Sequence, residues 1–243
     1  MSILLIPVAP LSRTKSRLRD CFSKEQLKDL TIAMFKDLAS KLLKVKFFEH
    51  KLVYCNTPEI LELAKDFGLT GIKEELTQPR KSFDEVIDDI NNIAMNNFNA
   101  ERTIFTFLDV ILISPKNFNE INSLMKKNQI LVCPAINTAG ISIFGRNPPK
   151  IVSSNCFSNP KKPSLISLFN EAENKGFNMT IYDSFRAGFD IDLKQDLVLA
   201  YEYLKIFNMT RTETYKFLKA NLKLTIQKTS LKNNRNFKFI KKV

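Results

Sequence analysis

Residues 3–42 read ILLIPVAPLSRTKSRLRDCFSKEQLKDLTIAMFKDLASKL, and they indicate the fold class of the whole chain. Its opening apolar run, residues 3–8, predicts a buried strand. Ser23 and Gln26 then form the reciprocal capping pattern that starts a helix. Apolar residues follow at three- and four-residue steps, at Leu27, Leu30, Met34, Leu38 and Leu42. A strand, a loop and a helix with one buried face are the beginning of an α/β unit.

The same alternation continues beyond this stretch. Further short apolar runs predict strands at residues 51–55, 71–74, 103–108, 130–133, 141–144 and 179–182. Capping residues and helical periodicity predict helices that begin near Pro58, Ser82, Ser114, Ser164 and Lys194. We therefore expect one α/β domain over residues 1–208, with a mostly parallel sheet and helices on both faces.

The composition is that of a compact globular protein. The chain has 243 residues, of which 44% are hydrophobic and 26% charged, so a fully disordered or collagen-like chain is excluded. No apolar run approaches the roughly 20 residues of a membrane helix, and no signal-peptide pattern opens the chain, so we expect a cytoplasmic protein without a membrane span. Four widely separated cysteines and one histidine indicate neither a disulfide framework nor a zinc site.

The positive charge is concentrated at the C-terminal end. The net charge is +12, and residues 209–243 contain ten Lys and Arg against the single acid Glu213. We expect a helix capped by Thr210 and Glu213 that runs to about Ile226, followed by a mobile basic tail. Such a segment, 209–243, could contact polyanions such as RNA or anionic membranes.

A cationic loop, residues 10–18, follows the first expected strand. It carries Arg13, Lys15 and Arg17 among hydroxyl side chains. Ligands of parallel α/β sheets bind at the carboxyl ends of the strands, and a triphosphate requires cationic donors. The loop could instead be a solvated basic turn. In either case we expect Lys15 to be exposed and its removal to change stability little.

Three carboxylates are the candidate metal ligands. Asp109 interrupts the apolar run 103–113, and an acid there should lie at a strand end where it meets a cation or water. Asp190 and Asp192 alternate along the chain and so share one side of it. The alternatives are local: Asp109 could cap backbone amides, although Ser114 is better placed for the next helix, and Asp192 could cap the helix at Lys194. Together with the loop, the acids fit a magnesium-dependent nucleotide site.

Several motifs in this order resemble one known family. They are IPVAPLSRTKSRL at 6–18, SKEQL at 23–27, DVILISP at 109–115, YDSF at 182–185 and DIDLKQDL at 190–197. The pattern over residues 3 to about 205 is similar to the 2-phospho-L-lactate guanylyltransferases of deazaflavin coenzyme F-420 biosynthesis. The resemblance implies a single nucleotidyltransferase domain of the nucleotide-diphospho-sugar transferase type, Mg²⁺ as cofactor, and GTP and a small phosphorylated carboxylic acid as partners. It leaves a homodimer open.

The resemblance also implies roles for individual residues. Lys15 and Asp109 would be catalytic, and Asp109, Asp190 and Asp192 would bind the metal. Thr138 and Ser164 would bind the acceptor, which is 2-phospho-L-lactate or phosphoenolpyruvate. The residues that would bind GTP are Leu11, Ser12, Arg13, Lys15 and Arg17.

This chain departs from the family pattern near these positions. Phe107 and Ile111 replace two prolines around Asp109, and residues 134–140 replace a stretch with three glycines. Asp84 replaces an asparagine, and Leu168 replaces a histidine of the acceptor motif. Besides an active enzyme, two other functions stay open. One is a non-catalytic paralogue that keeps the fold and a nucleotide, and the other is a polyanion-binding protein that works through its basic tail.

Overall fold

The chain forms a seven-stranded sheet in its described part. The computed structural model describes residues 1–138, 140–231 and 234–242. In them the strands lie in the order β3 (Thr70–Lys73), β2 (His50–Cys55), β1 (Ser2–Pro7), β4 (Arg102–Thr106), β6 (Ile141–Arg146), β5 (Ile130–Pro134) and β7 (Met179–Ile181). β6 is antiparallel to both its neighbours, and the other pairs are parallel. The connection from β5 to β6 is too short for a crossover, so β6 must run backwards. The predicted mostly parallel sheet is confirmed.

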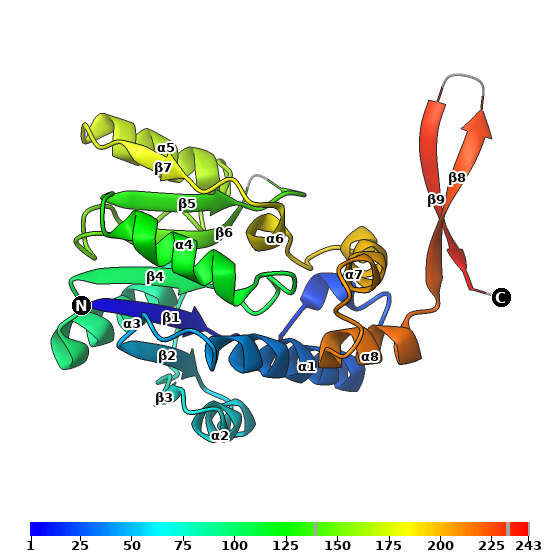
Figure 1. The fold of residues 1–243 in the computed structure, drawn as a ribbon, viewed down its shortest axis with the longest axis horizontal. Helices are drawn as coiled ribbons and strands as arrows, with labels where there is room; N and C mark the ends of the chain where they lie inside the picture. The colour runs from blue at the N-terminus through cyan, green and yellow to red at the C-terminus, as the bar shows by residue number, and fades with distance from the viewer. Residues whose placement is uncertain (139, 232–233, 243) are drawn as a thin grey trace.

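Helices cover both faces of the sheet (Figure 1). Side chains of β1 alternate between them, with Leu4 and Ile6 on one face and Ile3 and Leu5 on the other. The first face packs against α1 (Lys24–Leu42), α2 (Pro58–Asp66), α4 (Pro115–Met125), α6 (Phe185–Gly188), α7 (Lys194–Ile206) and α8 (Glu213–Asn221). The second packs against α3 (Phe83–Phe98) and α5 (Ser164–Asn174). Among the described residues, no helix has the length and apolarity that crossing a bilayer would take.

Local signals fix the helix ends. Ser23, Ser82 and Ser114 each accept a hydrogen bond from the backbone N–H three residues on, which confirms the predicted starts of α1, α3 and α4. Gly68 (φ 65°) and Gly176 (φ 73°) follow α2 and α5 in the left-handed conformation, which is easily reached without a Cβ atom.

The C-terminal segment differs from the prediction. The helix α8 ends at Asn221 rather than near Ile226, and Thr212 rather than Thr210 caps it. Where a mobile tail was expected, β8 (Leu224–Leu231) and β9 (Asn234–Lys241) form an antiparallel hairpin that projects away from the sheet (Figure 1). The physical reason is the spacing of Leu224 and Ile226, and of Phe237 and Phe239: a period of two fits a strand and not a helix.

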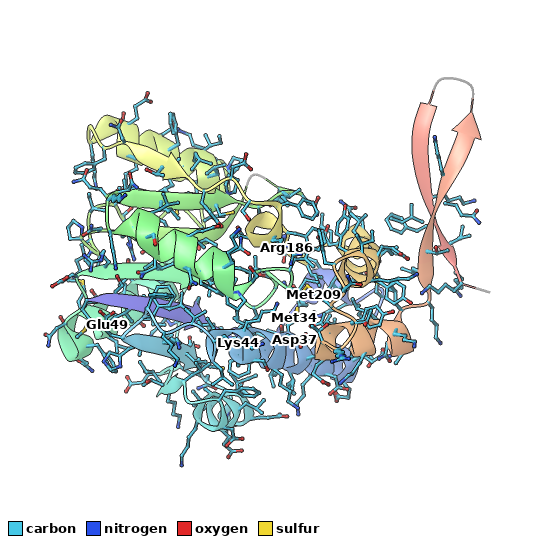
Figure 2. The ribbon with its side chains drawn as sticks, in the orientation of Figure 1. Met34, Asp37, Lys44, Glu49, Arg186 and Met209 are labelled. Atoms are coloured by element: carbon cyan, nitrogen blue, oxygen red, sulfur yellow. The ribbon has the colours of Figure 1, made fainter. Side chains whose placement is uncertain are left out.

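α8 packs on the core beside α1. Tyr215 and Leu218 belong to the main hydrophobic core. Asp37, on α1, lies beside α8 (Figure 2). Its carboxylate accepts hydrogen bonds from the backbone N–H groups of Glu213 and Thr214, each at 2.8 Å. A negative charge at a helix N-terminus is favourable because of the helix dipole. The domain limit at residue 208 stays a prediction, but α8 itself is bound to the body by buried contacts.

We expect Leu218→Ala to destabilise the protein by about 2–5 kcal/mol, because the side chain is fully buried and its truncation leaves a cavity. Leu43→Ala is the matched control: Leu43 is 55% exposed, so its loss should change the free energy of unfolding by less than about 0.5 kcal/mol. Urea denaturation of both variants measures the difference. Equal small effects would show that α8 is not needed for the folded core.

Candidate active site

A cavity of about 810 Å³ opens at the carboxyl ends of β1 and β4. Asp190 and Asp192, which come after β7, line the same cavity. The predicted site residues that line this cavity are Lys15, Arg17, Asp109, Thr138, Ser164, Asp190 and Asp192. They come from five separate parts of the chain, so the fold brings together most of the set that the sequence indicated.

The loop after β1 holds Lys15 in an uncommon conformation. The turn begins where the N–H of Arg13 donates to the carbonyl of Pro10. Lys15 then has φ 48° and ψ 42°, the left-handed region, immediately before the short 3₁₀-helix η1 (Ser16–Leu18). Leu18 is fully buried and anchors the end of this turn. A lysine adopts this backbone at some energetic cost, which is typical of residues held for function.

The ammonium group of Lys15 lies among the acids. Its Nζ donates to Oδ2 of Asp109 at 2.5 Å, to Oδ1 of Asp192 at 3.0 Å and to the carbonyl of Ile191 at 2.5 Å. The Lys15 side chain is only 12% exposed. Burial acts to lower the pKa of Lys15, but the charges of Asp109 and Asp192 outweigh it and the pKa is raised. The expectation of an exposed loop cation is therefore wrong, because the loop folds inward onto the two carboxylates.

Asp190 and Asp192 line this site, and Asp196 rather than Asp192 caps the start of α7. The Asp196 carboxylate accepts from the N–H groups of Asp192 and Leu193, which leaves the side chain of Asp192 free to meet Lys15. Oδ1 of Asp190 is buried without a hydrogen-bond partner in the described residues. Burial and the nearby charges of Asp109 and Asp192 raise the pKa of Asp190 to about 7.

Among the residues that the structure describes, the side chains of Asp109 and Asp192 do not cap local backbone amides or the helix at Lys194, the two alternatives that the sequence left open. Ser114 caps α4, as the sequence indicated, and both carboxylates pair with Lys15 instead. The carbonyl of Asp109 also accepts from the N–H of Ile191 at 3.3 Å, which ties the two acidic segments together.

Carboxylate oxygens are ligands that a hard cation prefers, but the positions of these three acids do not form a ready-made metal site. Within the described part of the chain, no group of three or more His, Cys, Asp or Glu side chains stands ready to hold a metal ion, and the ammonium of Lys15 lies between two of the acids. The unpartnered buried oxygen of Asp190 nevertheless fits an oxygen-seeking ion such as Mg²⁺. Magnesium binding by Asp109, Asp190 and Asp192 stays a proposal.

The other predicted nucleotide-binding residues, Leu11, Ser12, Arg13 and Arg17, belong to the same loop as Lys15. Arg17 is 67% exposed and its Nη1 is 3.4 Å from Oδ2 of Asp192, so it is free to turn toward a ligand. Ser12 and Arg13 are exposed. Leu11 is buried and donates its N–H to Oγ1 of Thr57, so only its backbone or its packing could serve the site.

The predicted acceptor residues Thr138 and Ser164 line the same cavity. Ser164 is the first residue of α5, as predicted. Oγ1 of Thr138 accepts from the N–H of Gly140 at 3.2 Å, and a Cβ at residue 140 would approach the same oxygen to 2.9 Å. The neighbouring Asn137 donates to Asp196 at 2.7 Å, which fixes this loop to α7. Residue 139 of the departing stretch lies outside the described residues.

Sequence reasoning missed three aromatic residues of the cavity. Phe83, Phe107 and Phe157 line it and pack against one another, with ring centroids 5.3–6.2 Å apart. Asp84 holds this cluster because its carboxylate accepts from the N–H groups of Phe157 and Ser158. The signal was hidden because Phe107 lies in an apolar run and Phe83 on the apolar face of the expected helix, where both look like core residues, and because Phe157 stands alone in a polar segment.

A second cavity of about 230 Å³ adjoins the first and was also missed. The two share Phe83 and the backbone at the end of β1, which provides Pro7, Val8 and Ala9. The remaining lining residues are Pro10, Arg13, Glu74, Glu75, Leu76, Thr77, Arg80, Lys81 and Val86. No periodic pattern marks residues 74–81, so the sequence alone shows only a polar connection there.

Known proteins resemble this chain in sequence and in fold. The family model described as guanylyl transferase CofC like matches residues 1–239. A 2-phospho-L-lactate guanylyltransferase of Methanocaldococcus vulcanius is 27% identical over 197 residues, 80% of this chain and 82% of that protein. A phosphoenolpyruvate guanylyltransferase of Thermobaculum terrenum is 22% identical over 196 residues, 80% of each. A structure from Desulfovibrio desulfuricans G20, assigned to the nucleotide-diphospho-sugar transferases, has a TM-score of 0.72 at 14% identity, covering 90% of this chain and 94% of that one.

Proposed function

The chain belongs to the CofC-like guanylyl transferase family, and we propose that it transfers GMP from GTP to a small phosphorylated carboxylic acid and releases pyrophosphate. The acceptor is 2-phospho-L-lactate or phosphoenolpyruvate, the substrates that appear in the names of its relatives. The observation that carries the proposal is the Lys15 ammonium paired with Asp109 and Asp192 on the wall of a large cavity. We further propose that the reaction takes place in the cytoplasm and serves deazaflavin coenzyme F-420 synthesis.

The large cavity would hold the reacting parts of both substrates. The triphosphate would lie against the loop that carries Lys15 and Arg17, and the acceptor would lie toward Thr138 and Ser164 across the same cavity. The aromatic cluster of Phe83, Phe107 and Phe157 covers one wall and would limit the entry of water, which competes with the acceptor for the nucleotide.

The reaction needs no nucleophile from the protein. An oxygen of the acceptor phosphate, already ionised at neutral pH, would attack the α-phosphorus of GTP, and the bond to pyrophosphate would break in line with it. Lys15 and Arg17 would donate hydrogen bonds to the departing pyrophosphate and balance its charge. Asp109, Asp190 and Asp192 would hold Mg²⁺, which when bound supplies positive charge that neutralises the phosphates.

A non-catalytic paralogue is the second candidate. It is favoured by Phe107 and Ile111 at positions where the family has prolines, and by the loss of glycines between residues 134 and 140. Such a protein would keep the fold and bind GTP without turnover. A homodimer, and contacts between polyanions and the basic segment 209–243, stay separate predictions.

Pyrophosphate release from GTP with Mg²⁺ tests the proposal. We expect pyrophosphate release with 2-phospho-L-lactate or phosphoenolpyruvate and no release without an acceptor. GTP should raise the melting temperature of the protein whether or not an acceptor is present. A protein that GTP stabilises but that releases no pyrophosphate with either acceptor would be the paralogue. A protein that GTP does not stabilise and that shows no turnover would contradict both readings.

A further inference from the structure

The smaller cavity contains a carboxylate that the proposed transfer reaction leaves unused. Glu74 lines this cavity and is only 7% exposed. In the described part of the chain, no hydrogen bond or ion pair engages its side chain. Burying a charged group without partners is costly, so a retained carboxylate of this kind suits a ligand that brings its own hydrogen-bond donors.

The cationic side chains of this cavity are Lys81, Arg13 and Arg80, and Lys81 is already paired elsewhere. Lys81 lines the same cavity, but its Nζ pairs with Oδ2 of Asp89 at 2.5 Å. Tyr54 donates a further hydrogen bond to that carboxylate at 3.3 Å. Lys81 is therefore held against α3 by Asp89, and in the described part of the chain none of the three cations forms an ion pair with Glu74.

The backbone holds Glu74 firmly in place. Its N–H donates to the carbonyl of Cys55 at 3.0 Å, and its carbonyl accepts from Nδ2 of Asn56 at 3.1 Å. The residue thus continues the pairing of β3 with β2 at the carboxyl end of both strands. A side chain on such a rigid element can select a ligand by geometry more sharply than one on a free loop.

The walls of the cavity suit a flat aromatic ring. Leu76 and Phe83 are 61% and 41% exposed, and both line it. Phe83 also lines the large cavity, so a nucleotide with its phosphates at Lys15 can place its base beside Phe83. Stacking on an aromatic face is favourable for any base and gives little selectivity. The selectivity must come from polar groups.

We propose that Glu74 selects guanine by accepting hydrogen bonds from its N1–H and 2-amino groups. A carboxylate offers two acceptor oxygens and no donor, which matches these two neighbouring donors on one edge of guanine. Adenine has an unprotonated N1 at this edge, and xanthine has a carbonyl oxygen at C2. Each of these atoms is an acceptor, so it would place a lone pair against the carboxylate and be repelled. The assignment rests on the proposed function, since it takes GTP as the nucleotide.

Calorimetric binding of GTP, ITP and XTP with Mg²⁺ to the full chain tests this assignment. Wild type should bind ITP, which lacks the 2-amino group, about tenfold more weakly than GTP, and XTP more weakly still. Glu74→Gln should weaken GTP roughly ten- to a hundredfold by the same reasoning. It should also strengthen XTP, because the amide can donate to the C2 carbonyl while it accepts from N1–H. Glu62→Gln, an exposed change on α2, is the matched control and should leave all three affinities unchanged.

The outcomes separate the assignment from the function on which it rests. If wild type binds GTP and turns it over, but Glu74→Gln keeps the wild-type ratio of GTP to XTP affinity, Glu74 does not read the base and only this inference fails. Wild type that binds ITP as tightly as GTP overturns it without any variant. If wild type binds no nucleotide, the proposed function and this inference fail together.

Discussion

Lys15→Met is expected to abolish pyrophosphate release and to destabilise the fold by about 2 kcal/mol. The ammonium group pairs with Asp109 and Asp192 and also binds the carbonyl of Ile191. Removing one partner of a fully buried ion pair costs about 3–5 kcal/mol. We expect a smaller loss because the Asp192 side chain is 33% exposed and water screens part of its charge.

The same variant should respond to magnesium differently from wild type. Without the ammonium, the negative charge of the three acids is no longer balanced, so Mg²⁺ alone should raise the melting temperature of Lys15→Met more than that of wild type. Arg19→Met, an exposed change just after the same loop, is the control and should change neither stability nor activity appreciably. A Lys15→Met protein with wild-type stability would mean that the buried ion pair does not form in solution.

Asp109→Asn is expected to lower the rate of pyrophosphate release by at least about 10²–10³-fold, the cost of losing one charge-stabilising group. The amide keeps the shape of the side chain but cannot pair with Lys15 as an ion or attract a hard cation. The fold should survive because Lys15 still contacts Asp192 and Ile191. Pyrophosphate release and melting curves of both proteins measure the two effects.

A control and a double variant sharpen this test. Asp183→Asn removes an exposed acid and should be silent. Because Asp109 and Lys15 contact each other, the stability losses of the double variant Lys15→Met/Asp109→Asn should be smaller than the sum of the single losses. If Asp109→Asn keeps full activity, Asp109 has no role in catalysis. Its role would then be to cap backbone amides, which Asn can also do.

Much of the fold follows from short-range patterns. The starts of α1, α3 and α4 were predictable because a serine and a polar residue three positions later exchange hydrogen bonds with each other's backbone N–H groups. This capping pattern is local and does not depend on distant segments. The hairpin of β8 and β9 was missed because its apolar residues follow a helix closely, and the change from a helical to an alternating period occurs within a few residues.

Local patterns were enough to predict the α/β order, the main helix starts and the kinds of residue that follow the strands, because each of these depends on residues close together along the chain. The contacts among those residues depend on how distant segments pack together in the fold. Lys15 and Asp109 are 94 positions apart, and Lys15 and Asp192 are 177 apart, yet the carboxyl ends of the strands bring them within 3.0 Å. Glu74 became visible as a buried carboxylate in a cavity for the same reason: burial and pairing arise from packing between distant segments, which no local pattern records.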